Sequence, residues 1–243
     1  NFKLGHRYED YGGEDDSTTI QSLLIEPDYT EEQKKQIEAF NELNWKTDGT
    51  YILKQSHSLL KIPDGFDLLI GEDVKKSCIL YKTPLLAQQE AVLHADYGRV
   101  IFQNFNKGYV SLDNWNRVDF SKWLTKLNLV VVENKISKPL KWKIEPTLKK
   151  ELNTIVSMLI VVDDGLEYVD AVAYKFSRKG CVSISWVVPI FNFCPNKFEE
   201  IVQSHSFEKG YAYSDYVKDD TKSSYDLPIF LYELSKQFQG KYS

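Results

Sequence analysis

The sequence predicts an α+β fold in which a mainly antiparallel, twisted sheet is flanked by helices. Short runs with the alternation and residue types of strands follow one another from about residue 45, and several of the loops between them are too short for a parallel crossover. Helical spacing of apolar residues appears before, between and after these runs. With 42% hydrophobic residues in 243, the chain can bury a sizeable core.

The predicted organisation is a single domain with polar arms. Residues 1–29 form a polar N-terminal arm, 30–190 the α+β core, and 191–243 an extension that packs on the core. The first helix is expected over 31–43, because Thr30 and Gln33 have the spacing of a capping box.

Strands are predicted next, in two groups separated by the acidic helix start at Glu72 and Asp73. The expected strands are 49–53, 58–62, 66–70, 91–94, 100–105 and 108–111. Asn106-Lys107-Gly108 has hairpin chemistry, since Asn and Gly tolerate positive φ, and it is expected to join the last two strands. Pro63-Asp64-Gly65 is expected to form the turn that leads into strand 66–70.

The second half of the chain is predicted to be a meander between helices. A helix capped by Asp119 or Ser121 would bury Phe120, Trp123, Leu124 and Leu127. The expected meander strands are 140–144, 154–162, 169–177 and 181–188, with tight turns at Asp163-Asp164-Gly165 and Arg178-Lys179-Gly180. Two helices follow, over 197–204 and within 223–238.

Charge and composition narrow the class of function. Lys and Arg number 30 against 35 for Asp and Glu, and the two signs are interspersed, which disfavours a nucleic-acid partner. No apolar run approaches the roughly 20 residues of a transmembrane helix, so no transmembrane segment is expected in this chain. No glycine-rich phosphate loop occurs, and we expect no cofactor.

Histidine and cysteine spacing predicts neither a metal site nor a disulfide framework. His6, His57, His94 and His205 lie far apart in the sequence, without partners at the spacing that a helix or strand metal site uses. The cysteines Cys78, Cys181 and Cys194 are interpreted as mostly buried small apolar residues, with one disulfide through Cys181 or Cys194 left open for an oxidising compartment.

One internal match stands out at a fixed offset. Phe2, Gly5, Tyr8, Asp10 and Tyr11 recur with the same spacing as Phe207, Gly210, Tyr213, Asp215 and Tyr216. A chain rich in Tyr and Asp produces some partial matches by accident. The other interpretation is that the chain starts in the tail of a preceding copy of the domain, and a longer sequence without an upstream copy would contradict it.

Short motifs in a fixed order carry a resemblance to a known family. They are Ile62-Pro63-Asp64-Gly65-Phe66 with Gly71-Glu72-Asp73; Gly108-Tyr109-Val110-Ser111 with Trp115 and Val118-Asp119; Trp142 with Glu145-Pro146-Thr147 and Asn153-Thr154; and Arg178-Lys179-Gly180. Together they resemble, over about residues 45–216, the bacterial family called domain of unknown function 2167, a family of predicted membrane-anchored proteins.

The resemblance implies a fold and a location. The family's order of elements is similar to a sandwich of the Mog1 and PsbP type, and its location is periplasmic or extracytoplasmic, with a C-terminal membrane anchor. This chain departs from that pattern, because residues 225–243 hold Pro228 and several charges in place of an apolar anchor. No catalytic residues are assigned in the family, so none is carried over.

The candidate binding residues are Tyr109, Trp115, Trp142, Arg178, Glu72 and Asp73. Tryptophans and tyrosines could line a groove for a peptide or glycan, although the same residues also fill sheet cores. Trp115 is expected to be exposed, because Asn114 and Asn116 flank it. Glu72 and Asp73 are the carboxylates that lie beside the densest motif.

The function expected from these observations is a non-enzymatic binding or scaffolding module of the bacterial cell envelope, with a protein partner. One alternative is a hydrolase-type enzyme that uses a carboxylate site near Glu72 and Asp73. The other is a secreted effector or immunity-type protein that reuses the fold without an anchor.

Overall fold

The computed structural model describes residues 29–80, 82–83, 85–95, 98–133, 139–163 and 165–235. The chain divides into two compact units, residues 1–42 and 43–243. The predicted polar arm, except Tyr29, lies outside the described residues, as does the predicted helical stretch beyond residue 235.

Helix α1 (Glu31–Asn41) is the described element of the first unit. The Thr30 hydroxyl accepts the Gln33 backbone N–H at 3.2 Å, and the Gln33 side-chain oxygen accepts the Thr30 N–H at 2.8 Å. This reciprocal pairing satisfies two donors that a helix start leaves free. The predicted capping box is therefore confirmed.

The second unit is built on a seven-stranded, fully antiparallel sheet. The strands, in spatial order, are β3 (Asp67–Ile70), β4 (Gln89–Ala95), β5 (Gly98–Phe105), β9 (Gly180–Pro189), β8 (Leu166–Ser177), β7 (Thr154–Asp163) and β6 (Lys141–Lys149). A smaller antiparallel sheet joins β1 (Thr50–Leu53), β2 (Ser58–Lys61) and β10 (His205–Phe207). The predicted α+β class, the antiparallel sheet and the meander from β6 to β9 are confirmed.

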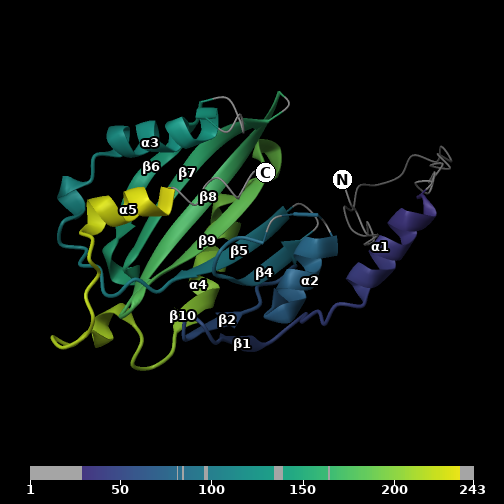
Figure 1. Ribbon diagram of the computed structural model, residues 1–243, viewed down its shortest axis with the longest axis horizontal. Helices are drawn as coiled ribbons and strands as arrows, with labels where there is room; N and C mark the ends of the chain where they lie inside the picture. Colours follow the sequence, from purple (N-terminus) through teal and green to yellow (C-terminus); the bar gives the residue numbers. More distant parts are fainter. Residues whose placement is uncertain are drawn as a thin grey trace, which may run out of the picture. The chain divides into compact units, whose positions relative to one another are not determined.

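Helices cover the two faces of the large sheet (Figure 1). On one face, α3 (Phe120–Glu133) and α5 (Leu227–Ser235) enclose a core that includes Trp123, Phe176 and Phe230. On the other face, α4 (Pro195–Ser204) and the small sheet enclose a second core around Trp186 and Phe198. Helix α2 (Glu72–Leu80) lies against β3 and β4.

The alternation of side chains along β9 supplies both cores. Val182, Ile184 and Trp186 point into the core beneath α4, whereas Cys181 belongs to the core beneath α3 and α5. Successive side chains of a strand point to opposite faces, so one strand serves two layers. All three cysteines are free, with Cys78 and Cys181 buried and Cys194 exposed.

The predicted strand 108–111 and the hairpin at 106–108 are wrong. In the described structure β5 ends at Phe105 and pairs on its two sides with β4 and β9, so no side of β5 is open to a returning strand. After Phe105 the chain instead leaves the sheet through these turn residues. The Gly108 N–H then donates to the Lys179 carbonyl at 2.9 Å.

Two further differences come from strand pairing that the local sequence pattern does not show. β6 extends to Lys149, beyond the expected end at residue 144, because β7 supplies it with partners as far as the pair Lys149 and Thr154. β10 was not predicted, because three residues carry little pattern by themselves and form a strand only where β2 offers an edge.

The turn and strand at Pro63 to Ile70 position α4. The Phe66 N–H donates to the Pro63 carbonyl at 3.2 Å, which closes the predicted turn. The Phe66 ring then packs edge-on against Trp186, and the Lys197 ammonium lies 5.5 Å from the Phe66 ring centroid. Lys197 also donates to the Asp64 carbonyl at 2.7 Å, so this motif contributes to holding α4 against the sheet.

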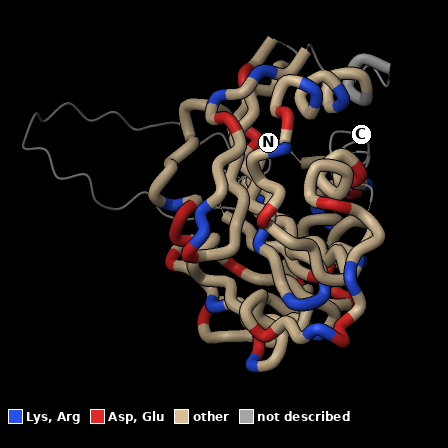
Figure 2. The backbone as a smooth tube through the Cα atoms, turned by 90° about the vertical axis from the view of Figure 1, so that its left-hand side faces the viewer, with Lys and Arg blue, Asp and Glu red and all other residues tan. Residues whose placement is uncertain are grey.

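Basic and acidic residues are interspersed along the backbone (Figure 2). Among the helices that the structure describes, none is long and apolar enough to cross a membrane.

Candidate functional site

The candidate site is formed by the loop of residues 208–226, which connects β10 to α5. Its only regular structure is a 3-10 turn at Tyr213–Asp215. Its composition is dominated by Tyr, Ser, Asp and Lys. Connections of this length in compact domains are usually functional or disordered, and this one is held by specific contacts. We call it the C-terminal loop.

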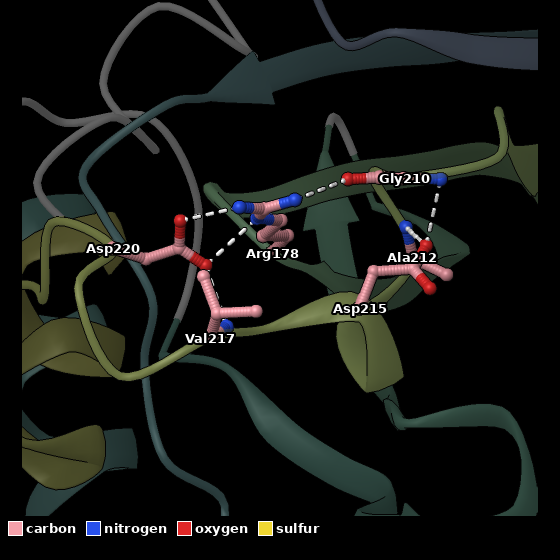
Figure 3. Close-up of polar contacts among 6 residues, drawn as sticks. All are labelled: Arg178, Gly210, Ala212, Asp215, Val217 and Asp220. Carbon is pink, nitrogen blue, oxygen red and sulfur yellow. Dashed lines mark hydrogen bonds and ion pairs between the residues drawn. The ribbon is translucent and has the colours of Figure 1, made fainter.

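A bidentate ion pair fastens the loop to the turn between β8 and β9 (Figure 3). The Arg178 guanidinium donates to the two Asp220 carboxylate oxygens, at 2.7 Å from Nε and 2.6 Å from Nη2. It also donates to the Gly210 carbonyl at 3.1 Å. A planar guanidinium matches a carboxylate fork, so Arg178 fixes both the position and the orientation of this part of the loop.

Further hydrogen bonds hold the loop in place. The Arg178 N–H donates to the Tyr211 carbonyl at 3.0 Å, and Ser177 forms an isolated antiparallel bridge with Ala212. Asp215 accepts the N–H groups of Gly210 and Ala212 at 2.9 and 3.0 Å (Figure 3). Asp215 therefore stabilises the fold of the loop itself, and Arg178 attaches the loop to the large sheet.

Tyr109 holds the second half of the loop. Its backbone N–H donates to the Thr221 carbonyl, and its carbonyl accepts the Ser223 N–H, both at 2.9 Å. Its ring stacks on Tyr216 with 3.8 Å between centroids and lies 4.9 Å from Tyr213. Stacked, partly buried tyrosines add contact area at a low entropic cost.

Three further contacts support the attachment. The Tyr213 hydroxyl accepts the Leu112 N–H at 2.9 Å. The Tyr211 ring stacks on His57 at 3.9 Å, and the Lys179 ammonium lies 4.9 Å from its centroid. We call the residues that receive the loop the docking edge, which comprises Tyr109, Leu112, Ser177, Arg178 and Lys179.

Two glycines allow the docking edge to form. A Cβ built on Gly108 would lie 2.7 Å from the Lys222 carbonyl carbon, and one built on Gly180 would lie 1.9 Å from the Phe105 carbonyl oxygen. Both also have positive φ, at 83° and 148°. Gly108-Tyr109 and Arg178-Lys179-Gly180, two motifs far apart in the sequence, are thus brought together to receive one loop.

The electrostatics of the site follow from the same contacts. Hydrogen bonding to Asp220 raises the pKa of Arg178, and hydrogen bonding to Arg178 lowers the pKa of Asp220. Burial raises the pKa of Tyr109, and its hydrogen bond with Tyr213 adds to this effect. At neutral pH the site therefore holds the charged Arg178–Asp220 pair beside the neutral Tyr109 phenol.

The outer face of the loop carries exposed side chains. Val217 is 50% exposed and Tyr225 is 41% exposed. Lys209, Ser214, Lys218, Asp219 and Lys222 are also exposed. The loop thus has a fastened inner face and an outer face that mixes aromatic, aliphatic and charged groups.

The structure brings together two of the six candidate residues named from sequence, Tyr109 and Arg178, at the docking edge. Trp115 is half-buried rather than exposed, because it packs against Phe120 with 5.3 Å between centroids. Trp142 packs edge-on against the buried Trp123 at 5.7 Å. These two tryptophans contribute to the core beneath α3.

Glu72 and Asp73 begin α2, as expected, and each has a lysine partner one turn later. Glu72 pairs with Lys75 at 2.6 Å and Asp73 with Lys76 at 3.1 Å. The Glu72 side chain is 76% exposed. In the first turn these carboxylates also interact favourably with the helix dipole, so the geometry gives them a role in α2.

Sequence reasoning missed Asp220, and it did not select Tyr213, Tyr216 or Asp215 as site residues. Tyr213, Tyr216 and Asp220 contact positions that are distant in the sequence, such as Leu112, which lies 101 residues before Tyr213. No local pattern predicts which arginine a given aspartate will meet. The available signal was the internal match, which contains Tyr213, Asp215 and Tyr216.

A buried polar network lies on the opposite side of the large sheet. His205 Nε2 lies 2.9 Å from the Ser58 hydroxyl, which lies 2.7 Å from the Ser56 hydroxyl. The Ser56 N–H donates to Glu90 at 3.2 Å. Burial, with the nearby Lys175, lowers the pKa of His205 to about 3, and burial raises the pKa of Glu90.

This network is a structural element of the core. His205, Ser58 and Glu90 come from β10, β2 and β4, so their contacts join the small sheet to the large one. Lys175 supports the same region by donating to the Val202 carbonyl at 3.0 Å and to the His205 carbonyl. Across the residues that the structure describes, no group of His, Cys, Asp and Glu side chains is arranged to hold a metal ion.

Comparison with known proteins finds a matching family and a similar solved structure. The model of the family described as "Protein of unknown function (DUF2167)" matches residues 45–229. The chain is similar to the solution structure of cyanobacterial PsbP (CyanoP) from Synechocystis sp. PCC 6803, at 9% identity and a TM-score of 0.49, covering 67% of this chain and 94% of that one. No curated protein matches the sequence.

Proposed function

We propose that this chain, which belongs to the DUF2167 family of proteins of unknown function, is a non-enzymatic module that binds a protein partner through the outer face of its C-terminal loop. The observation that carries the proposal is the attachment of a long, tyrosine-rich loop by Arg178 and Tyr109. Such an attachment prepares the loop for binding before the partner arrives.

The chemistry of the loop favours a protein as partner. Tyr is enriched at the centres of protein interfaces, and Ser and Gly provide adaptable hydrogen bonding in binding loops. Val217 and Tyr225 supply exposed apolar area, and the surrounding Lys and Asp residues form a polar rim. Pre-ordering the loop reduces the entropy lost on binding.

The edge strand β6 fits this role less well. β6 is paired only with β7 and carries Lys141, Lys143 and Pro146, with two register shifts along its length. Lysines, proline and bulges are the features that protect an edge strand from pairing with another chain. Recognition of a partner by the loop is therefore favoured over addition of a partner strand to β6.

The proposal places the protein in the bacterial cell envelope, outside the cytoplasm. Support for this location comes from the family resemblance, whose members are described as predicted membrane-anchored proteins. A secreted protein would also pass through the cell envelope during export. Fusion to a reporter enzyme that folds only outside the cytoplasm tests the location, and an inactive reporter on the full-length protein would contradict it.

The binding proposal is tested by affinity capture of the full-length protein in its native host. We expect a partner that wild type retains and that the double variant Val217→Ser, Tyr225→Ala loses. Leu166→Ala is the matched control, because Leu166 is 59% exposed and begins the strand that ends at Ser177, so it lies at the opposite end of β8. Equal capture by the double variant and wild type would overturn the proposal.

A further inference from the structure

The small sheet has an open edge at β1. This strand pairs with β2 on one side, and within the described residues no strand lies on its other side. The Gly49 carbonyl accepts the Ile62 N–H of the β2 side at 2.9 Å. Because hydrogen bonding alternates along an antiparallel pair, the N–H and C=O groups of Thr50 and Ile52 point away from β2, to the open edge. Both residues are exposed.

The residues of β1 favour strand pairing. The strand reads Thr-Tyr-Ile-Leu, which is rich in β-branched and aromatic types and holds neither a proline nor a charge. Its pairing with β2 runs without a register shift. The Ile52 side chain is 54% exposed and lies opposite the half-buried Leu59 of β2, on the outer face of the small sheet. A strand added to this edge would cover part of that apolar pair.

The other sheet edges in the described part of the chain are protected. β6 carries lysines, Pro146 and register shifts. On β3, Leu68 exchanges two backbone hydrogen bonds with Lys46, at 3.0 and 2.8 Å. On β10, the His205 carbonyl accepts a hydrogen bond from the Lys175 ammonium. β1 has none of these features, so it is the edge most open to pairing with another strand.

We propose that β1 is a self-association edge, which pairs antiparallel with β1 of a second copy of this chain about a two-fold axis. In a hydrogen-bonded pair of an antiparallel ladder, both residues direct their backbone groups to the neighbouring strand. Pairing Thr50 of one copy with Ile52 of the other meets this condition on both sides of the axis. The two Tyr51 residues then face each other at the axis as a non-hydrogen-bonded pair.

The charges at the two ends of the strand favour a second copy as the occupant. Asp48 precedes β1 and Lys54 follows it, and both are exposed. Two identical antiparallel strands bring Asp48 of each copy near Lys54 of the other, whereas parallel pairing would bring like charges together. Tyr51 already packs in part against the core beneath α4, so its ring meets its counterpart at a low entropic cost.

The expected interface is small. A pair of four-residue strands buries less than the roughly 1,200 Å² at which standard interfaces begin, so we expect a weak dimer whose population rises with concentration. A covalent trap detects such a dimer because it accumulates each encounter. The proposal uses no residue of the docking edge or the C-terminal loop, so it stands or fails separately from partner binding at the loop.

The test is disulfide trapping of the full chain in which the exposed Cys194 is replaced by serine. Thr50→Cys and Ile52→Cys proteins are oxidised separately and as an equimolar mixture, and linked dimer is quantified on non-reducing gels. A mixture of Ser206→Cys and Ile52→Cys measures random collision, because Ser206 is exposed on β10. Paired Cα atoms about 5.5 Å apart are within disulfide reach, so we expect the Thr50 and Ile52 mixture to give at least about fivefold more dimer than the collision control.

A proline variant tests whether the linkage needs strand pairing. Adding Thr50→Pro to the Ile52→Cys protein removes an N–H of the open edge and leaves the hydrogen bonds to β2 in place. We expect linkage to Thr50→Cys to fall to the control level, whereas Thr50→Ala, which keeps the N–H, retains it. Circular dichroism checks that each variant is folded. Linkage no higher than in the collision control, or equal linkage by the proline and alanine forms, would overturn the proposal.

Discussion

Arg178 and Asp220 are joined by two parallel hydrogen bonds of 2.7 and 2.6 Å, and through them the turn between β8 and β9 holds the loop that precedes α5. The Arg178 and Asp220 side chains are 27% and 18% exposed, so water screens the pair only in part. The pair therefore fastens the C-terminal loop to the large sheet.

Arg178→Lys should release the loop without unfolding the domain. Lysine keeps the positive charge but cannot donate to both Asp220 oxygens and the Gly210 carbonyl in one plane. We expect hydrogen exchange at Gly210 and Ala212 to become faster by about tenfold or more, with the buried strands unchanged. Arg99→Lys is the control, because Arg99 is exposed and lies at the end of β5 opposite Phe105. Equal exchange in Arg178→Lys and wild type would contradict the role given to Arg178.

Gly180→Ala should destabilise the domain more than Gly165→Ala. Both glycines have positive φ, but a Cβ at Gly180 would lie 1.9 Å from the Phe105 carbonyl oxygen, whereas one at Gly165 would meet nothing within 4 Å. We expect Gly165→Ala to lower the free energy of unfolding by about 1–2 kcal/mol, and Gly180→Ala to lower it by more. Chemical denaturation measures the free energy of unfolding of both variants. Similar losses would contradict the prediction, because they would show that the backbone near Phe105 moves enough to accommodate the new Cβ.

The buried His205 should make the protein sensitive to acid. Its pKa is lowered from 6.5 to about 3. Between these pH values the unfolded state binds a proton at His205 and the folded state does not. The stability that neutral His205 contributes is complete above pH 6.5 and is lost as the pH falls toward 3. Between these values the loss is about 1.4 kcal/mol per pH unit.

The measurement compares urea denaturation of wild type and His205→Gln at pH 7 and pH 5. The variant should show a smaller decrease in the free energy of unfolding on acidification. Burial lowers the pKa of His94 to about 3 as well, and the raised pKa of Glu90 acts in the opposite direction. The difference between wild type and His205→Gln isolates the contribution of His205. An identical pH dependence of the free energy of unfolding in the two proteins would refute that contribution.

The edge strand β6 should become a site of self-association when its protective residues are replaced. Lys143 is exposed, and Pro146 lies within the register shift between Ile144 and Thr147 in the pairing with β7. We expect the double variant Lys143→Val, Pro146→Thr to form higher oligomers in light scattering, because it presents a longer regular edge. Lys75→Val on α2 adds similar apolar area, and equal association by that control would assign the effect to surface hydrophobicity.

Much of the fold could be predicted because its signals are local. The capping box of Thr30 and Gln33, the turn at Pro63-Asp64-Gly65 and the alternation of β7 to β9 depend on residues close together in the sequence. The same reasoning failed at 106–108, where the residues of a tight turn instead connect β5 to the docking edge. A turn pattern shows that the chain can bend there, but it does not show which strand occupies the neighbouring position.

The candidate site was predicted only in part, for the same reason. Tyr109 and Arg178 were selected through family motifs, whereas Asp220 was not selected. Trp115 was expected to be exposed from its polar neighbours, but Phe120 covers it in part. The division into an arm, a core and an extension stays a prediction, as do the protein partner and the envelope location.

By itself the sequence determined the α+β class, the antiparallel meander and the family, because periodicity, turn chemistry and motif order are properties of neighbouring residues. Only the tertiary structure decided that Arg178 meets Asp220 and that Gly108 and Gly180 lie where one loop docks. Those contacts arise when the strands align, and the alignment depends on the packing of two cores that draw residues from the whole second unit.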